Sequence, residues 1–209
     1  LIMSKGHGAL AQYIAMQHAG LISKEELYSY KSNDTMFYAH PSMNRKKGIE
    51  FSSGSLGQGL SLAVGVSLAL KRKENFNSKI YVVLGDGECD EGSVWEAAAS
   101  ASHYNLSNII AVVDSNKLQY DGSTEEILNM NNLGEKWKSF GWKVFNVDGH
   151  SVKKLIEVFR TETDSPKVVI ANTIKGKGIS FMENNPVWHN NRLTEKQYLV
   201  AMEELNNND

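Results

Sequence analysis

Two residues that carry oxygen ligands stand thirty positions apart, each close behind an apolar run of strand length. Asp86 follows the run 80–84, and Asn116 follows the run 109–113. The residues between them place Val94, Ala97, Ala98 and Ala101 on one face of a predicted helix. In a parallel βαβ unit the carboxyl ends of the two strands lie side by side, at the edge where open α/β folds bind ligands. We therefore expect Asp86 and Asn116 to face the same site.

The chemistry of this pair favours a divalent metal ion and a phosphate. Asp86, Asn116 and the main-chain carbonyl of Leu118 would offer three oxygen ligands, a set that suits Mg²⁺, or Ca²⁺ or Mn²⁺ in its place. The amide of Gly87 can approach a phosphate without a side chain in the way. An aspartate and an asparagine at strand ends can also simply cap turns. The spacing of the pair favours metal and diphosphate binding over that alternative.

Seven segments, taken in order, resemble the transketolase family, whose diphosphate-binding motif is GDG followed about thirty residues later by Asn. They are SKGHG at 4–8, HP at 40–41, SSGSLGQGL at 52–60, GDGECDEGSVWEA at 85–97, DSNKLQYDG at 114–122, IKGKG at 174–178 and WH at 188–189. GDG alone is a weak signal, but seven ordered matches across nearly the whole chain are a strong one. The resemblance implies a thiamine diphosphate cofactor.

The resemblance also assigns cofactor contacts. It implies that Gly54, Ser55 and Leu56 wrap the aminopyrimidine and thiazolium rings, and that His7 contacts both the diphosphate and the substrate. Lys175 would place its ammonium on the diphosphate; the alternative, which the resemblance disfavours, is a solvated lysine at a strand end. For the glycine-rich loop 54–59, the disfavoured alternative is helix packing alone.

Three further positions matter for the reaction by resemblance. His40 would contact substrate hydroxyls, and His189 would bond both cofactor and substrate; a neutral imidazole can accept the hydroxyl proton that ketose cleavage must remove. Glu91, and less clearly Glu96, matches a pair of glutamates that in the family forms an acidic, water-filled path between two active sites. The alternative is that these glutamates at the start of a helix only complement the helix dipole. Asn190 stands where family members often have Gly. The other three histidines, His18, His103 and His150, lack such context and are interpreted as structural.

The catalytic glutamate that activates the cofactor belongs to a different domain in this family, and one domain is all that 209 residues suggest. We therefore expect a split transketolase that moves a two-carbon ketol unit between sugars or sugar phosphates. Its second chain would carry the pyrimidine-binding domain, in a heterotetramer with two copies of each chain. The alternatives are a thiamine enzyme with a 2-oxo acid donor, similar to deoxyxylulose-phosphate synthase, and a non-catalytic cofactor-binding subunit. The family's first helix, with its own histidine and serine, is missing before Leu1, so we expect a fragment of a longer subunit.

Composition limits the remaining possibilities. A net charge of −2 favours neither nucleic acid nor a membrane surface as a partner, and no apolar run approaches membrane-span length. Cys89 is the single cysteine, which excludes an intrachain disulfide and fits a reducing cytoplasm.

Alternating apolar runs and helical patterns predict one α/β domain over 1–209, with a doubly wound parallel sheet and helices on both faces. We expect strands at 80–84, 109–113, 143–147 and 167–173, and helices at 8–19, from Ser23, and at 60–72, 133–140, 152–161 and from Thr194. Ile156 and Phe159 should face the core, Leu199, Met202 and Leu205 should share one side of the last helix, and 206–209 should fray.

Overall fold

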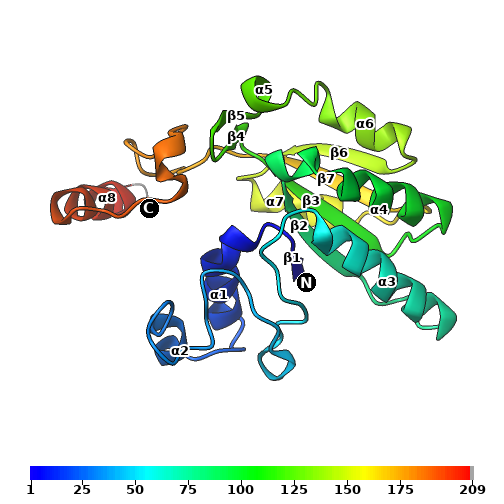
Figure 1. Cartoon of the computed structure of the whole chain (residues 1–209), viewed down its shortest axis with the longest axis horizontal. Helices are drawn as coiled ribbons and strands as arrows, with labels where there is room; N and C mark the ends of the chain where they lie inside the picture. Colours follow the sequence, from blue (N-terminus) through cyan, green and yellow to red (C-terminus); the bar gives the residue numbers. More distant parts are fainter. Residues whose placement is uncertain (208–209) are drawn as a thin grey trace.

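A computed structural model describes residues 1–207 of the chain (Figure 1). The strands are β1 (Ile2–Met3), β2 (Ile80–Gly85), β3 (Ile109–Ser115), β4 (Leu118–Gln119), β5 (Gly122–Ser123), β6 (Lys143–Asp148) and β7 (Lys167–Asn172). The α-helices are α1 (Ala9–His18), α2 (Lys24–Tyr28), α3 (Gln58–Arg72), α4 (Gly92–His103), α5 (Thr124–Ile127), α6 (Leu133–Ser139), α7 (Val152–Arg160) and α8 (Glu195–Asn207). Four 3₁₀ turns complete the set: η1 (Gly6–Gly8), η2 (Arg45–Lys47), η3 (Gly87–Asp90) and η4 (Pro186–His189).

Five strands form one parallel sheet in the order β1-β2-β3-β7-β6. The predicted βαβ unit is present: Gly85 and Asp114 are register partners at the carboxyl ends of β2 and β3. The α/β class and the parallel sheet are thus confirmed, as are the four expected strands. β1 was not expected, because two residues are too few for a periodic signal. β4 and β5 pair separately as a small antiparallel hairpin.

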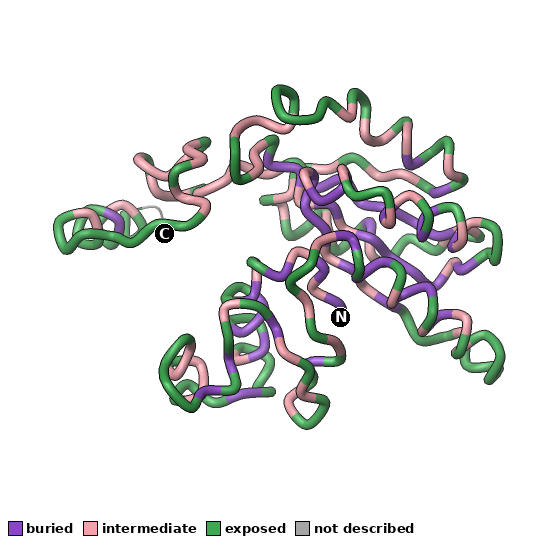
Figure 2. The backbone as a smooth tube through the Cα atoms, viewed as in Figure 1, coloured by how far each residue is buried: buried purple, intermediate pink, exposed green. Residues whose placement is uncertain are grey.

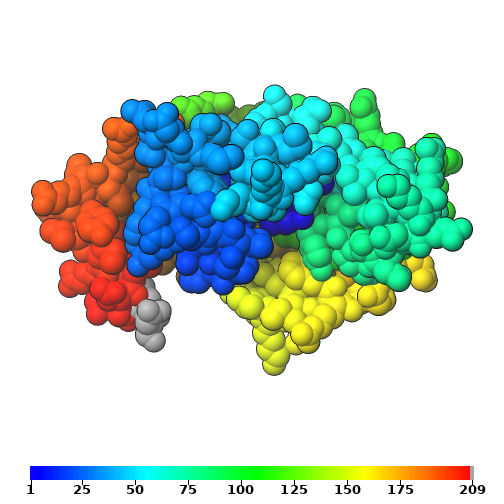
Figure 3. Space-filling model, turned by 90° about the horizontal axis from the view of Figure 1, so that it is seen from below, coloured from blue at the N-terminus to red at the C-terminus, as the bar shows by residue number. Residues whose placement is uncertain are grey.

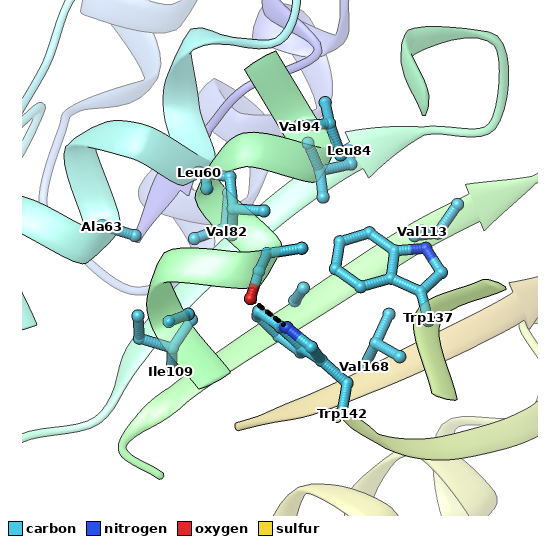
Figure 4. Close-up of a cluster of buried hydrophobic side chains, with 14 of the residues drawn as sticks. Leu60, Ala63, Val82, Leu84, Val94, Ile109, Val113, Trp137, Trp142 and Val168 are labelled. Atoms are coloured by element: carbon cyan, nitrogen blue, oxygen red, sulfur yellow. Dashed lines mark hydrogen bonds between the residues drawn. The ribbon is translucent and has the colours of Figure 1, made fainter. Parts of the chain in front are cut away.

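One face of the sheet packs against α3, α4 and α6. Alternate residues of β2 and β3, among them Val82 and Val113, point toward these helices and are fully buried. Trp137 on α6 is also fully buried, and the Trp142 indole donates a hydrogen bond of 3.0 Å to the Ala98 carbonyl of α4 (Figure 4). The expected inward position of Trp137 is confirmed.

The opposite face carries α7, which gives the two-sided arrangement that a parallel sheet requires. Val158 packs there with Ile110 and Val169, and Phe159 lies partly buried against them. The prediction for Ile156 is wrong, because its side chain is 42% exposed. Lys167 crosses beneath the end of α7, where its ammonium donates to the carbonyls of Val158, Phe159 and Thr161.

A smaller core lies apart from the sheet, around α1 and α2. Tyr13 at its centre stacks edge-to-face on Phe37 and Tyr30. Ser23 caps α2 with a full capping box, as expected for the start of this helix.

Helix α8 lies at one end of the molecule (Figures 1 and 3). Its apolar side is largely open: Leu199 is 62% exposed, and Met202 and Leu205 are also exposed, whereas Ala201 is the buried position (Figure 2). Residues 206 and 207 continue the helix rather than fray, and 208–209 lie outside the described residues. No helix in the described part of the chain is long and apolar enough to cross a membrane.

Candidate active site

A cavity of about 140 Å³ opens at the carboxyl ends of β2 and β3, between the N-terminal segment and the loops after β3 and β7. Residues from six separate stretches of the sequence line it: Lys5, His7, Leu56, Gly85, Asp86, Gly87, Glu88, Asn116, Leu118, Gln119, Tyr120, Lys175 and His189. The predicted juxtaposition of Asp86 and Asn116 is therefore observed.

Backbone amides hold the Asp86 carboxylate in place. One oxygen accepts a 2.9 Å bond from the Gly87 amide, and the other accepts a 2.6 Å bond from the Lys117 amide. Burial raises the pKa of Asp86 above its usual value, against the effect of these two bonds. The side-chain oxygen of Asn116 accepts a 3.0 Å bond from the Leu118 amide. Both side chains are more than nine-tenths buried and fixed in direction.

Two lysines bring positive charge to the cavity. The Lys5 ammonium lies 2.5 Å from a carboxylate oxygen of Asp114, and the Thr173 hydroxyl bonds the other oxygen. Burial would raise the pKa of Asp114, but the Lys5 charge and these hydrogen bonds outweigh it and lower the pKa. Burial, followed by the nearby Lys5 charge, lowers the pKa of Lys175. Lys5 is paired with Asp114, whereas Lys175 forms no ion pair within 4 Å in the described residues, so its positive charge is available to an anion.

Aromatic rings form the outer wall of the cavity. The ring centroids of His7 and His189 are 4.9 Å apart, and Tyr120 meets His189 edge-to-face at 5.3 Å. Burial and then the Lys5 charge lower the pKa of His7 to about 4, and burial followed by the Lys175 charge lowers that of His189. Both imidazoles are therefore neutral at pH 7, the form that can accept a proton. His189 Nδ1 is buried without a hydrogen-bond partner in residues 1–207.

The glycine-rich loop closes one side of the site through a left-handed residue. Gly57 has φ +78°, and a Cβ placed there would lie 2.5 Å from the Ser93 hydroxyl and 2.7 Å from the Glu91 Cβ. The Ser93 hydroxyl donates 3.1 Å to the Gly57 carbonyl. This contact fixes the loop against the start of α4 and turns Leu56 into the cavity.

Four predicted residues lie outside the cavity wall. Gly54 and Ser55 line a neighbouring hollow of about 260 Å³, next to the loop segment that carries Leu56. His40 lies beside Gly6: a Cβ added to Gly6 would lie 3.0 Å from the His40 ring, so His40 is next to the segment that carries His7. Glu91 is exposed at the start of α4, behind the loop.

The sequence-based reasoning missed several members of the site: Lys5, Glu88, Asp114, Tyr120 and Thr173. Lys5, Glu88, Asp114 and Tyr120 stand inside segments that resemble the family, which offered a signal. Thr173 lies outside them and is revealed by its contact with Asp114.

Comparison with known proteins identifies the family. Residues 1–207 match the family model "Transketolase, thiamine diphosphate binding domain". The chain is 42% identical over 208 residues to the 6-deoxy-6-sulfo-D-fructose transketolase subunit SqwG of a Clostridium species, covering 98% of this chain and 75% of that one. It is also 42% identical over 206 residues to an apulose-4-phosphate transketolase subunit of Actinobacillus succinogenes, covering 98% and 74%.

The solved structures agree with this result. The transketolase of Campylobacter jejuni superposes with a TM-score of 0.88 at 27% identity, over 98% of this chain and 34% of that one. This chain thus spans about a third of that solved transketolase. It belongs to the transketolase family and matches its thiamine diphosphate-binding domain, which confirms the family inferred from the seven segments.

The residues present fit this cofactor. The cavity combines two lysines for a diphosphate with a partnerless buried nitrogen, His189 Nδ1. Over residues 1–207 no three His, Cys, Asp or Glu side chains cluster closely enough to hold a metal by themselves. A divalent ion here would have one carboxylate, one amide oxygen and a carbonyl from the protein, and phosphate or water oxygens for the rest, as Mg²⁺ commonly does.

Proposed function

We propose that this chain is the diphosphate-binding subunit of a two-chain transketolase, which moves a two-carbon ketol unit from a ketose phosphate to an aldose phosphate. The cavity at the ends of β2 and β3 carries the proposal, because it joins a fixed carboxylate, two lysines and two neutral imidazoles. Two similar proteins, named above, are called transketolase subunits, which supports a partner chain. We propose two copies of each chain in the assembly.

In this proposal the metal site consists of Asp86, Asn116 and the Leu118 carbonyl. The amides of Gly87 and Lys117 each bond one carboxylate oxygen of Asp86, and each oxygen keeps acceptor capacity for a metal ion. A divalent ion held there would neutralise part of the diphosphate charge. The ammonium groups of Lys5 and Lys175 would bind the diphosphate oxygens that remain.

Thiamine diphosphate supplies the carbanion chemistry that breaks and forms the carbon–carbon bond. The protein's part is to position groups and move protons. His189 and His40 are the proposed proton acceptors at the substrate hydroxyls; the His7 ring lies 4.9 Å from the His189 ring, and Gly6, the residue before His7, lies beside His40. Burial, and after it the nearby lysine charges, lowers the pKa of His7 and His189, which keeps the imidazoles ready to accept a proton.

The chain must be assembled with its partner for a test of activity. We expect no ketol transfer by the purified chain alone and full transfer after co-expression with a pyrimidine-binding chain. Transfer is measured with a ketose phosphate donor and an aldose phosphate acceptor. A monomer with full turnover would refute the two-chain proposal, and carbon dioxide released from a 2-oxo acid would redirect it to the other class of thiamine enzyme.

Asp86→Ala tests the metal site in the assembled enzyme. Wild type should retain thiamine diphosphate only while a divalent ion is present, and the variant should not retain it in either case. Ser67→Ala is a suitable control, because Ser67 is fully buried and bonds Asn108 away from the cavity. A variant that retains the cofactor as tightly as wild type does while the divalent ion is present would exclude Asp86 as the ligand.

A further inference from the structure

Glu88 is a buried carboxylate that the proposed reaction does not use. It follows the GDG turn inside η3 and is 2% exposed. Three donors converge on it: the Ser4 hydroxyl at 2.5 Å and the Gly57 amide at 2.8 Å meet one oxygen, and the Gly85 amide meets the other at 3.0 Å. A buried carboxylate is stable only when such donors replace its lost hydration.

Each donor belongs to a segment that carries a different wall of the cavity. Ser4 precedes Lys5 and His7, Gly57 follows Leu56, and Gly85 precedes Asp86. Ser4 extends the connection, because its hydroxyl oxygen accepts a 3.1 Å bond from the Gly59 amide at the start of α3. One carboxylate thereby joins segments that lie 84 and 31 positions from it in the chain.

We propose that Glu88 is a positioning residue that sets the spacing between the diphosphate end of the site and the glycine-rich loop. It acts through the amides of Gly57 and Gly85. Holding Gly57 fixes its neighbour Leu56, and holding Gly85 fixes its neighbour Asp86. The proposal rests on the proposed function, since the walls it aligns are those of the cofactor site.

The chemistry of the side chain explains why a glutamate is needed. An ionised carboxylate only accepts hydrogen bonds and has room for all three donors. Glutamine keeps the shape but has one acceptor oxygen, and its NH₂ group would face an N–H or O–H donor. Aspartate keeps the charge but is one methylene shorter, so it cannot reach all three segments.

The test compares Glu88→Gln with Ser67→Ala, which also removes a buried hydrogen bond but lies outside the site. Amide hydrogen exchange over 54–60 and 84–88 is measured on the chain, and thiamine diphosphate affinity is measured with Mg²⁺ on the assembled two-chain enzyme. We expect Glu88→Gln to speed exchange in both segments and to weaken cofactor binding by about 10–100-fold, since hydrogen bonds to a charged group are strong. Ser67→Ala should change neither, whatever its effect on melting temperature.

Unchanged exchange in Glu88→Gln would overturn the proposal, and so would faster exchange with wild-type affinity. If Glu88→Gln does not fold, Ser4→Ala serves in its place, because it removes one donor and leaves the carboxylate. It should speed exchange at the Gly59 amide and weaken binding about 3–10-fold, and wild-type values in it would also overturn the proposal. A wild-type complex that binds no thiamine diphosphate would instead refute the proposed function, while the exchange measurements would still decide whether Glu88 holds the two segments.

Discussion

Gly57→Ala should be the most damaging single-methyl change in the glycine-rich loop. The residue has φ +78°, a conformation that alanine disfavours by about 1–2 kcal/mol. The new Cβ would also lie 2.5 Å from the Ser93 hydroxyl and 2.7 Å from the Glu91 Cβ. Overpacking of this kind costs about 1–3 kcal/mol. The sum, about 2–5 kcal/mol, should lower the melting temperature by roughly 5–20 °C in a chain of this size.

Thermal unfolding followed by circular dichroism measures the stability change, and calorimetric titration of the assembled enzyme measures cofactor affinity. The loop carries Leu56, so affinity should fall together with stability. Gly65→Ala is the matched control: Gly65 lies within α3, and a Cβ there meets nothing within 4 Å. This control should gain about 0.5–1 kcal/mol from helix propensity. If the melting temperature of Gly57→Ala lies within about 2 °C of wild type, the left-handed conformation of Gly57 is not needed for stability.

Three other outcomes are expected. Lys167→Met should lower the free energy of unfolding by about 3 kcal/mol in urea denaturation, because three carbonyls at the end of α7 lose their buried donor. An equal loss in the exposed-lysine variant Lys153→Met would contradict this. His7 should titrate near pH 4 by proton NMR. Because its pKa in the folded chain is lowered from 6.5, its contribution to stability should be lost as pH falls from about 6.5 to about 4. A transition at its ordinary pKa would show that burial and the neighbouring charges do not act on it. His40→Ala and His189→Ala should reduce ketol transfer by about 10²–10⁴-fold at saturating cofactor; wild-type turnover in both would exclude the proposed proton-transfer role.

The sheet could be predicted because its signal is local. The apolar runs of β2 and β3 are separated by a segment with helical periodicity, which predicts a βαβ unit. Asp86 and Asn116 stand where these parallel strands end, so the topology alone predicted that they meet. Ser23 at the start of α2 likewise carries its capping signal within four residues.

The rest of the site depends on contacts that no local pattern encodes. Glu88 meets Ser4 across 84 positions, and Lys5 meets Asp114 across 109. The prediction that Ile156 faces the core failed for a different reason. Periodicity reports which residues share a helix face, but how far that face is covered depends on the neighbouring elements.

The strand order has a consequence for how this chain is made. β3 pairs with β2 on one edge and with β7 on the other, and β7 begins at Lys167, about fifty residues after β3 ends at Ser115. A ribosome adding about 5–20 residues per second needs roughly 3–10 s for that stretch. During this interval the emerging chain displays an apolar strand edge with open amides and carbonyls, a template for pairing with another nascent chain. We therefore expect the yield of this chain to depend on the rate of protein synthesis and on chaperone supply, as well as on its final stability.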